Sequence, residues 1–414
     1  MSDTFRKAML NRLPPVAPTR APWAAGNAEG MDEDQEELEE GDSMAELGQS
    51  LPSSSRSRSN DQDLSPISAA AYFGQALEVQ PTSRPGIAFR AYYTPPALAA
   101  ASSATASGSS APAAKPKGSV LLCHHGAGSS GLSFAVLAKE VKERDAELGV
   151  LAFDARGHGK TKTQPVEAEH DLSLITLTAD LMALIQHMFP DPAEAPALLL
   201  MGHSMGAAPI LEASPALQKL GYNVPGVVVL DVVEGTAVES LPLMKGILSH
   251  RPRTFKSVID GIHWHITSNA IRNPTSARIS VPSYLTPSPS SGTDTDVGER
   301  QTWRADLMPT EPFWQEWWSG LSQKFLQAKC ARLLVLAGQE RLDKDLMVGQ
   351  MQGKFQLDVM QDVGHYLHED DPAHLASTVI AFWRRNTRVL VLPPKVGQAV
   401  SGGKALEVKR VGEV

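Results

Sequence analysis

Residues 200–208, LMGHSMGAA, contain the pattern G-x-S-x-G with Ser204 at its centre. The pattern follows an apolar run, APALLLMG, and precedes a stretch of helix-forming residues, AAPILEAS. A strand that ends at G-x-S-x-G before a helix is typical of a nucleophile elbow, whose sharp turn lifts a serine hydroxyl above the edge of a sheet. The alternative is a serine that only caps a helix, so the rest of the sequence has to decide.

Five short apolar runs share a rhythm along the chain. They are SVLLCHHG (119–126), LGVLAFDARGHG (148–159), APALLLMGHS (195–204), GVVVLDVVEG (226–235) and ARLLVLAGQE (331–340). Helical patterns such as DLSLITLTADLMALIQHMF (171–189) lie between them. Continuous apolar strands that alternate with helices predict a mostly parallel sheet with helices on both faces. Ligands bind such sheets at the carboxyl ends of the strands, so the polar residues that end these runs are expected at one cleft.

The composition excludes several classes of protein. The 414 residues are 42% hydrophobic with a net charge of -8, and no basic stripe is available for nucleic acid. The only cysteines, Cys123 and Cys330, stand far apart in strand-like contexts, which favours buried thiols in a reducing compartment. No apolar run approaches membrane-spanning length, and the first residues lack the apolar core of a secretion signal. We therefore expect a cytoplasmic or nuclear protein without membrane partners.

The chain divides into a catalytic-type domain and two tails. Residues 1–64, with the acidic MDEDQEELEEGD and a Ser/Arg-rich segment, are expected to be a disordered tail. Residues 65–388 are expected to form the α/β domain, with a strand in GIAFRAYYTP (86–95) and a low-complexity linker at 97–117. An aromatic-rich, mainly helical cap is expected at about 240–328, with a flexible insert at 286–300. The tail at 389–414 shows no clear element.

A serine nucleophile needs a general base and an acid that orients the base. In the elbow architecture the acid and then the histidine follow the serine along the chain. His365, behind Gly364 in FQLDVMQDVGHYLHEDDP (355–372), is the histidine that follows the last sheet strand in a loop, so it is the candidate base. His368 is interpreted as structural or supporting.

The acid remains open from the pattern alone. Asp231 ends the strand after the elbow helix, whereas Glu340, Asp343 and Asp345 follow the next sheet strand, another usual position for the acid. His263 and His265 flank Trp264 but have no third ligand nearby, so no metal site is predicted.

Two backbone N–H groups are expected to hold the oxyanion. One belongs to Met205, the residue after the nucleophile, and the other to Ala127 in the loop CHHGAGSSG after the first apolar run. This His-Gly-x-Gly loop, DARGHGKT (154–161) and the elbow are three elements of one architecture in the right order. Together they predict an α/β-hydrolase fold with Ser204 as the nucleophile.

Several long stretches resemble the protein phosphatase methylesterases. These are GHSMGAA, LDVVEGTAVESL, RPRTFKSVIDGIHWHITSNAIRNPTSARIS and LAGQERLDKDLMVGQMQGKFQLDVMQDVGHYLHEDDP. Members of this family remove the methyl ester from the C-terminal leucine of the type 2A protein phosphatase catalytic subunit, with a Ser-Asp-His triad and no cofactor. The resemblance implies Ser204 as nucleophile, Asp231 as acid and His365 as base. Ala207 departs from the glycine that is usual in the family, and the insert is less acidic than in animal relatives.

Substrate selection cannot rest on the methyl group, because one carbon discriminates by only about 1–3 kcal/mol. The aromatic residues of the expected cap and two basic residues after the base are candidates for binding the substrate, although core packing and a solvated helix end explain them as well. They are Trp264, Phe313, Trp314, Trp317, Trp318, Arg384 and Arg385. Two other functions stay open: a small-molecule esterase or lipase, and a phosphatase-binding regulator that acts independently of catalysis.

Overall fold

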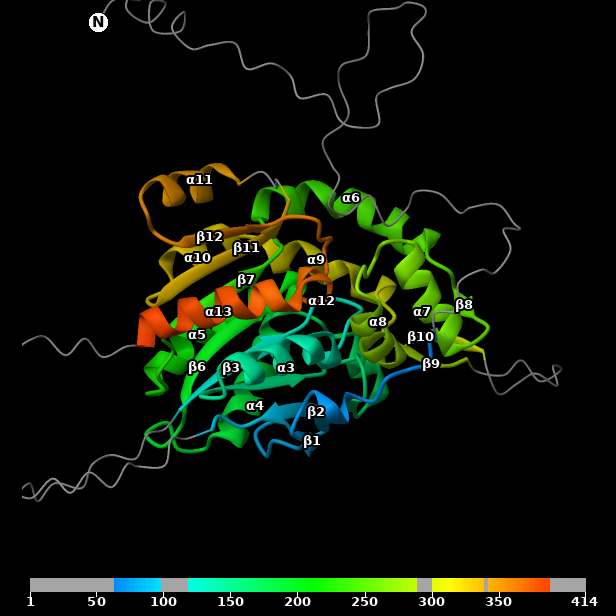
Figure 1. Ribbon diagram of the computed structural model, residues 1–414, viewed down its shortest axis with the longest axis horizontal. Coiled ribbons are helices and arrows are strands. Elements are labelled where there is room, and N and C mark those ends of the chain that lie inside the picture. Colours follow the sequence, from blue (N-terminus) through cyan, green and yellow to red (C-terminus); the bar gives the residue numbers. More distant parts are fainter. Residues whose placement is uncertain (1–62, 98–117, 289–299, 339–341, 388–414) are drawn as a thin grey trace, which may run out of the picture. The chain divides into compact units, whose positions relative to one another are not determined.

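The computed structural model describes residues 63–97, 118–288, 300–338 and 342–387. A mostly parallel sheet runs through it (Figure 1), in the strand order β1-β2-β4-β3-β6-β7-β11-β12, with β5 paired to β2. Neighbours from β4 to β12 are parallel, and β1, β2 and β5 pair antiparallel. The strands are β1 (Gln75–Val79), β2 (Ile87–Thr94), β3 (Ser119–His124), β4 (Leu148–Phe153), β5 (Lys162–Thr163), β6 (Ala197–His203), β7 (Gly226–Leu230), β11 (Ala331–Ala337) and β12 (Gln356–Met360). All five apolar runs and GIAFRAYYTP are confirmed as strands.

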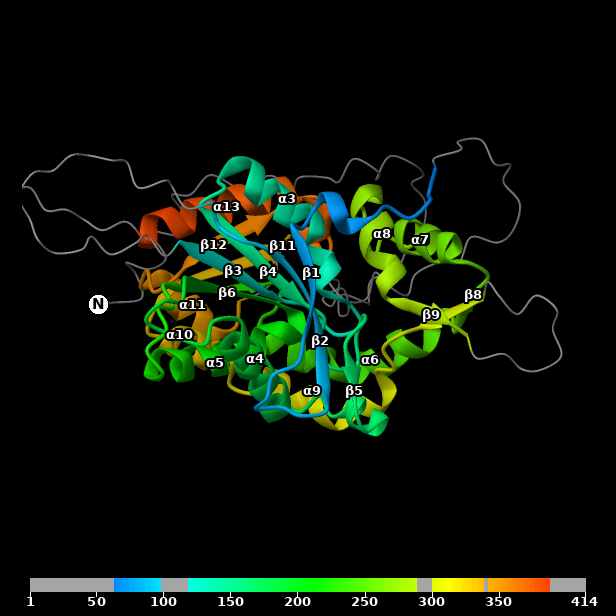
Figure 2. The same cartoon turned by 90° about the horizontal axis from the view of Figure 1, so that it is seen from below.

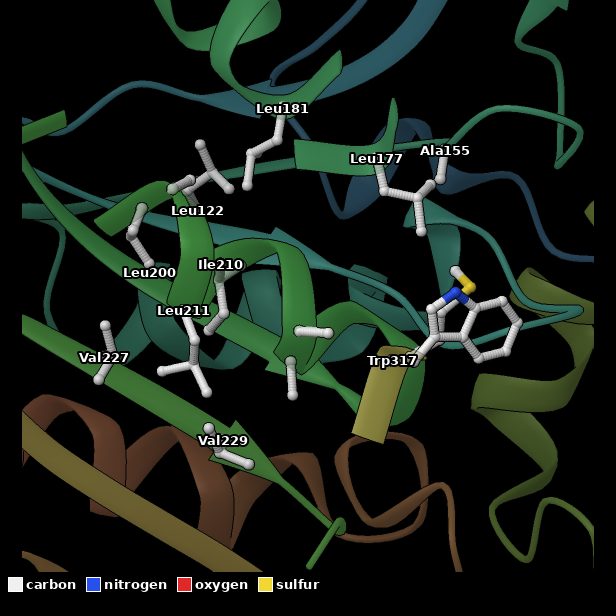
Figure 3. Close-up of a cluster of buried hydrophobic side chains, with 14 of the residues drawn as sticks. Leu122, Ala155, Leu177, Leu181, Leu200, Ile210, Leu211, Val227, Val229 and Trp317 are labelled. Carbon is white, nitrogen blue, oxygen red and sulfur yellow. The ribbon is translucent and has the colours of Figure 1, made fainter. Parts of the chain in front are cut away.

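The central strands are largely apolar because both faces of the sheet are covered. Side chains alternate along a strand, so Leu122 and Leu200 belong to one core cluster, and Leu121 and Met201 to the other. Figure 3 shows the first cluster, in which strand residues meet Leu181 and other helical side chains. The helices over the two faces are α3 (Ala135–Arg144), α4 (Leu174–Met188), α5 (Ala207–Lys219), α10 (Leu321–Gln327), α11 (Lys344–Met351) and α13 (Pro372–Thr387).

Different helices cover the two faces of the sheet. Helices α4 and α5 contribute to the cluster that contains Leu122, whereas α3 and α13 contribute to the cluster that contains Leu121. Cys123 is buried in the second cluster, and it and Cys330 are free thiols. The expected two-faced α/β core is therefore confirmed.

A second group of elements lies beyond one end of the sheet (Figures 1 and 2). It has its own apolar cluster, which includes Ile262, Ile271 and Val281. Besides helices it contains a small antiparallel sheet in the order β8-β10-β9, which the sequence did not indicate. Its elements, with α9 beside them, are α6 (Glu234–His250), β8 (Thr254–Phe255), α7 (Val258–Thr267), α8 (Pro274–Ser280), β9 (Leu285–Pro287), β10 (Gln301–Trp303) and α9 (Glu311–Trp318). We call residues 234–318 the cap.

Several expectations fall outside the described residues. They concern the tail at 1–62, the linker at 98–117, most of the insert, Glu340, and the segment from 388 onward. Strand β9 extends to Pro287, inside the range expected for the insert. Within the described ranges, the helices are too short or too polar to cross a membrane.

Candidate active site

The turn at Ser204 has the geometry of a nucleophile elbow. Strand β6 ends at His203, one 3-10 turn (Ser204–Gly206) follows, and α5 begins at Ala207. Ser204 has φ of 49°, a left-handed backbone that a non-glycine residue rarely adopts. A Cβ on Gly202 would lie 2.3 Å from the Gly206 carbonyl oxygen, and a Cβ on Gly206 would lie 2.4 Å from the carbonyl oxygen of His124. Both glycines are therefore required for the chain to turn this tightly.

Ser204 lines a pocket at the carboxyl ends of the strands, between the sheet and the cap. The loop after β3 contributes Ala127, the elbow contributes Ser204 and Met205, and the loop after β12 contributes His365. The rest of the wall is largely apolar and comes from the cap. Cap residues of this wall are Met244, Ile247, Leu248, Trp264, Tyr284, Trp303, Leu307, Trp317 and Trp318. Four of the five residues predicted for the site thus line one pocket.

The fifth predicted residue, Asp231, lies beneath His365. The Nδ1–H group of His365 donates a hydrogen bond of 2.7 Å to Oδ2 of Asp231, whose side chain is fully buried. The other carboxylate oxygen accepts a bond of 2.7 Å from the backbone N–H of Ala337. These contacts fix the carboxylate. They also hold the imidazole in the tautomer that carries its proton on Nδ1, so that Nε2 can accept a proton, as a general base requires.

The alternative acids lie elsewhere. Asp343 accepts hydrogen bonds from the Ser322 hydroxyl and from the backbone N–H of Leu346, so it caps α11. Asp345 accepts a 3.3 Å bond from the side-chain amide of Gln323. Among the described candidates, Asp231 alone contacts the imidazole of His365.

A second histidine supports the first. His203 is buried, and its Nε2–H group donates a 2.8 Å hydrogen bond to the carbonyl oxygen of His365. Burial lowers the pKa of His203 well below its usual range, so its ring stays neutral and keeps this bond at neutral pH. His368 is buried against Phe134, with ring centroids 4.6 Å apart, and burial lowers its pKa to about 3.

The loop that carries Ala127 is held by the DARGHG segment. The ring Nε2 of His158 accepts a 2.9 Å bond from the Gly128 N–H, and Asp154 accepts a 2.8 Å bond from the N–H of Gly131. Burial lowers the pKa of His158 to about 4, so the ring remains an acceptor. The motif therefore places the loop that faces Ser204.

The other residues that the sequence suggested for substrate or metal binding lie in the pocket wall, in the hydrophobic core or at the protein surface. Trp317 and Trp318 line the pocket and are also buried in the core, and Trp314 is buried beside them. Arg384 donates a 2.7 Å bond to Asp145 of the same chain. His265 is buried in the wall and His263 is exposed, so they do not form a pair.

Sequence reasoning missed two residues of this region. Arg251 lines the pocket. Glu369 is buried and accepts a hydrogen bond from Tyr284, another residue of the pocket wall. The stretch RPRTFKS did contain Arg251 as a family-like motif, but its position beside the elbow follows only from the fold.

Comparisons with known proteins place this chain in a family. A family model described as "Alpha/beta hydrolase family" matches residues 120–377. A Cryptococcus neoformans protein named protein phosphatase methylesterase 1 is 58% identical over the full length of both chains. A protein of the same name from Aspergillus fumigatus is 40% identical and covers 96% of this chain and 92% of its own. The chain belongs to the protein phosphatase methylesterase family.

Solved structures show the same fold for this methylesterase-family chain. The crystal structure of E-2-(acetamidomethylene)succinate hydrolase has a TM-score of 0.55 at 17% identity and covers 75% of this chain and 99% of its own. A Mycobacterium tuberculosis esterase has a TM-score of 0.51 at 17% identity, with 75% and 91% covered. At such identities the likeness concerns the fold alone. The expected α/β-hydrolase fold is confirmed, and family membership makes the chain an esterase.

Proposed function

We propose that this chain removes the methyl ester from the C-terminal leucine of the type 2A protein phosphatase catalytic subunit. The observation that carries the proposal is the 58% full-length identity to a protein named protein phosphatase methylesterase 1. The pocket supports it, because an elbow serine, a histidine and a buried carboxylate meet there without any need for a cofactor.

The chemistry assigned to these residues is acyl transfer. Ser204 Oγ attacks the ester carbonyl carbon while His365 Nε2 takes the hydroxyl proton. Asp231 holds the imidazole through its 2.7 Å bond to Nδ1 and stabilises the imidazolium that forms. The N–H groups of Met205 and Ala127 stabilise the oxyanion, and losing one such donor typically costs about 3 kcal/mol.

The intermediate breaks down in two stages. His365 gives its proton to the departing methoxide, so that methanol leaves and an acyl-enzyme on Ser204 remains. Water then attacks the acyl carbon with His365 as the base, and the peptide leaves with a free carboxylate. Each step uses the same base and the same oxyanion donors.

Demethylation of the carboxymethylated phosphatase catalytic subunit tests the proposal. We expect the wild-type chain to release methanol, and Ser204→Ala to lower the rate by roughly 10⁴-fold or more. We expect Asp231→Asn to lower kcat by at least about 10³-fold, because the amide favours the wrong imidazole tautomer. Rates are read from the loss of the methyl group under single-turnover and steady-state conditions.

Asp343→Asn is the matched control. Asp343 caps α11 and asparagine caps a helix equally well, so this variant is expected to keep near wild-type activity. Loss of activity in Asp343→Asn with retention in Asp231→Asn would move the acid to Asp343. Hydrolysis of small aryl esters without demethylation of the phosphatase would show that the esterase acts on another substrate.

A further inference from the structure

Arg251 is a cation in the wall of the catalytic pocket with no role in the mechanism above. It follows the last residue of α6 and lines the pocket together with Ser204 and His365. Its Nη1 lies 3.7 Å from the position that a Cβ would take on Gly128. The guanidinium is therefore next to the loop that carries Ala127, close to where the ester carbonyl would sit.

The fold holds this guanidinium in place. Its central carbon lies 4.0 Å from the centroid of the Trp303 ring, a distance at which the ring attracts a cation. The Trp303 indole N–H donates a 2.7 Å bond to the carbonyl oxygen of Pro252, which fixes the backbone next to Arg251. A cation that is fixed before a ligand arrives loses little side-chain entropy on binding.

The described residues place no carboxylate in hydrogen-bond contact with the buried Nε of Arg251. Its Nε is buried without a hydrogen-bond acceptor. Tyr366 and the exposed carboxylate of Asp306 act on it at longer range, and Asp306 also accepts a 3.1 Å bond from the backbone N–H of Met308. Burial lowers the pKa of Arg251, but a guanidinium starts so high that it stays charged at neutral pH. A partly buried cation without an adjacent anion is costly, and a ligand that supplies one reduces that cost.

We propose that Arg251 is a specificity residue that binds a carboxylate of the ligand beside the scissile ester. Two carboxylates can arise there: the C-terminal carboxylate that ester hydrolysis creates, and an acidic side chain just before the esterified residue. Both would accept hydrogen bonds from the same guanidinium. The inference rests on the proposed function only in taking the Ser204 pocket as the esterase site.

Inhibition of an uncharged reporter ester, p-nitrophenyl acetate, measures this directly. The inhibitors are acetyl-Gln-Leu amide as the neutral reference, acetyl-Glu-Leu amide with a side-chain carboxylate, and acetyl-Gln-Leu free acid with a C-terminal carboxylate. We expect at least one acid to bind wild type about tenfold or more tightly than the neutral reference, because a hydrogen bond to a charged group has that strength. The acid that does so identifies the source of the carboxylate.

The preference is expected to disappear in Arg251→Met, with a ratio of inhibition constants near one. Arg253→Met is the matched control, since Arg253 is exposed two residues along the same segment, and it should keep the wild-type ratio. An unchanged ratio in Arg251→Met, or equal binding of all three compounds by wild type, overturns the proposal.

Arg251→Lys covers the case in which the Met variant does not fold. An ammonium lacks the planar fork that lies over Trp303, so we expect the ratio to fall by at least about threefold, and a wild-type ratio counts against the proposal. The assay uses no phosphatase. It can therefore succeed where phosphatase demethylation fails, and the two failures are distinguishable.

Discussion

Glu369 is a fully buried carboxyl group, and its burial favours the protonated form. Its Oε2 lies 2.5 Å from the Ser280 hydroxyl, which also lies 3.0 Å from the Ser276 carbonyl oxygen. The hydroxyls of Ser280 and Tyr284 donate to the two oxygens of Glu369, and these bonds favour its ionised form. Burial outweighs these bonds and raises the pKa of Glu369 to about 8, so the folded protein holds this proton at neutral pH.

This proton has a consequence for stability. The unfolded chain releases it near pH 4.5 and the folded chain near pH 8, so between these values the folded state binds more protons. Stability then falls as pH rises through this window, by up to about 1.4 kcal/mol per pH unit, and levels off above it. Glu369→Gln keeps the shape and the hydrogen bonds but cannot ionise. We expect the variant to gain stability relative to wild type between pH 5.5 and 8.5, as measured by urea unfolding.

The comparison contains its own control. Both proteins share every other titrating group, so the difference between their free energies of unfolding isolates Glu369. Two curves that stay parallel from pH 5.5 to 8.5 would show that Glu369 is ionised in the folded protein.

At the scale of elements, the short helix α12 (Leu367–Asp370) joins the loop of His365 to the cap. Asp370 at its end accepts 2.8 Å and 2.7 Å bonds from the backbone N–H groups of Gly364 and Arg272. One carboxylate thus holds the residue before His365 and the chain that leads into α8. We expect Asp370→Ala to lower the free energy of unfolding by about 2–4 kcal/mol. We also expect kcat to fall about tenfold, since each 1.4 kcal/mol lost in positioning costs a factor of ten.

Asp371→Ala separates these effects. Asp371 accepts a 3.0 Å bond from the His374 N–H at the start of α13, and loss of such a cap costs about 1 kcal/mol. Its kcat should stay at the wild-type value. Equal kcat in the two variants would mean that Asp370 stabilises the fold without positioning His365. Urea unfolding and steady-state kinetics on one reporter ester provide both readings.

The elements differ in how far the sequence predicts them. Strands such as β3 and β6 are predicted because each has a continuous apolar run that ends in a polar residue. The elbow is predicted because a turn this tight requires glycine at fixed spacing. The cap sheet is not predicted, since its strands are two or three residues long and too short for a periodic pattern.

Residues that depend on distant segments are hidden for a different reason. Arg251 lies next to Gly128, and Glu369 contacts Ser280, although the residues of each pair are far apart in the sequence. No local sequence pattern predicts a contact between residues so far apart in the chain. The acid shows the same limit: spacing alone leaves Glu340, Asp343 and Asp345 open beside Asp231. The family resemblance favours Asp231, and the structure places it against His365.

At the scale of the whole molecule, the pocket exists because the cap is fastened to the sheet domain. Arg304, just after β10, donates 2.9 Å and 3.1 Å bonds to the carboxylate of Glu169. It also donates to the carbonyl oxygens of Gly159 and Thr161, at 3.1 Å each. The exposed fractions of the Arg304 and Glu169 side chains are only 23% and 16%. A single guanidinium therefore ties the cap to the segment that contains the DARGHG motif.

Removal of this tie should loosen the cap before it unfolds the sheet. Arg304→Met leaves the Glu169 carboxylate partly buried without its partner, and we expect a loss of about 3 kcal/mol in the free energy of unfolding. Lys245→Met is the control, because the Lys245–Glu311 pair has exposed fractions of 55% and 44% and should contribute less than about 1 kcal/mol. Amide hydrogen exchange tells where the loss occurs: faster exchange confined to residues 254–303 would show the cap opening on an intact sheet. Uniformly faster exchange across β3 and β6 would contradict this, and would mean that cap and sheet unfold as one cooperative unit.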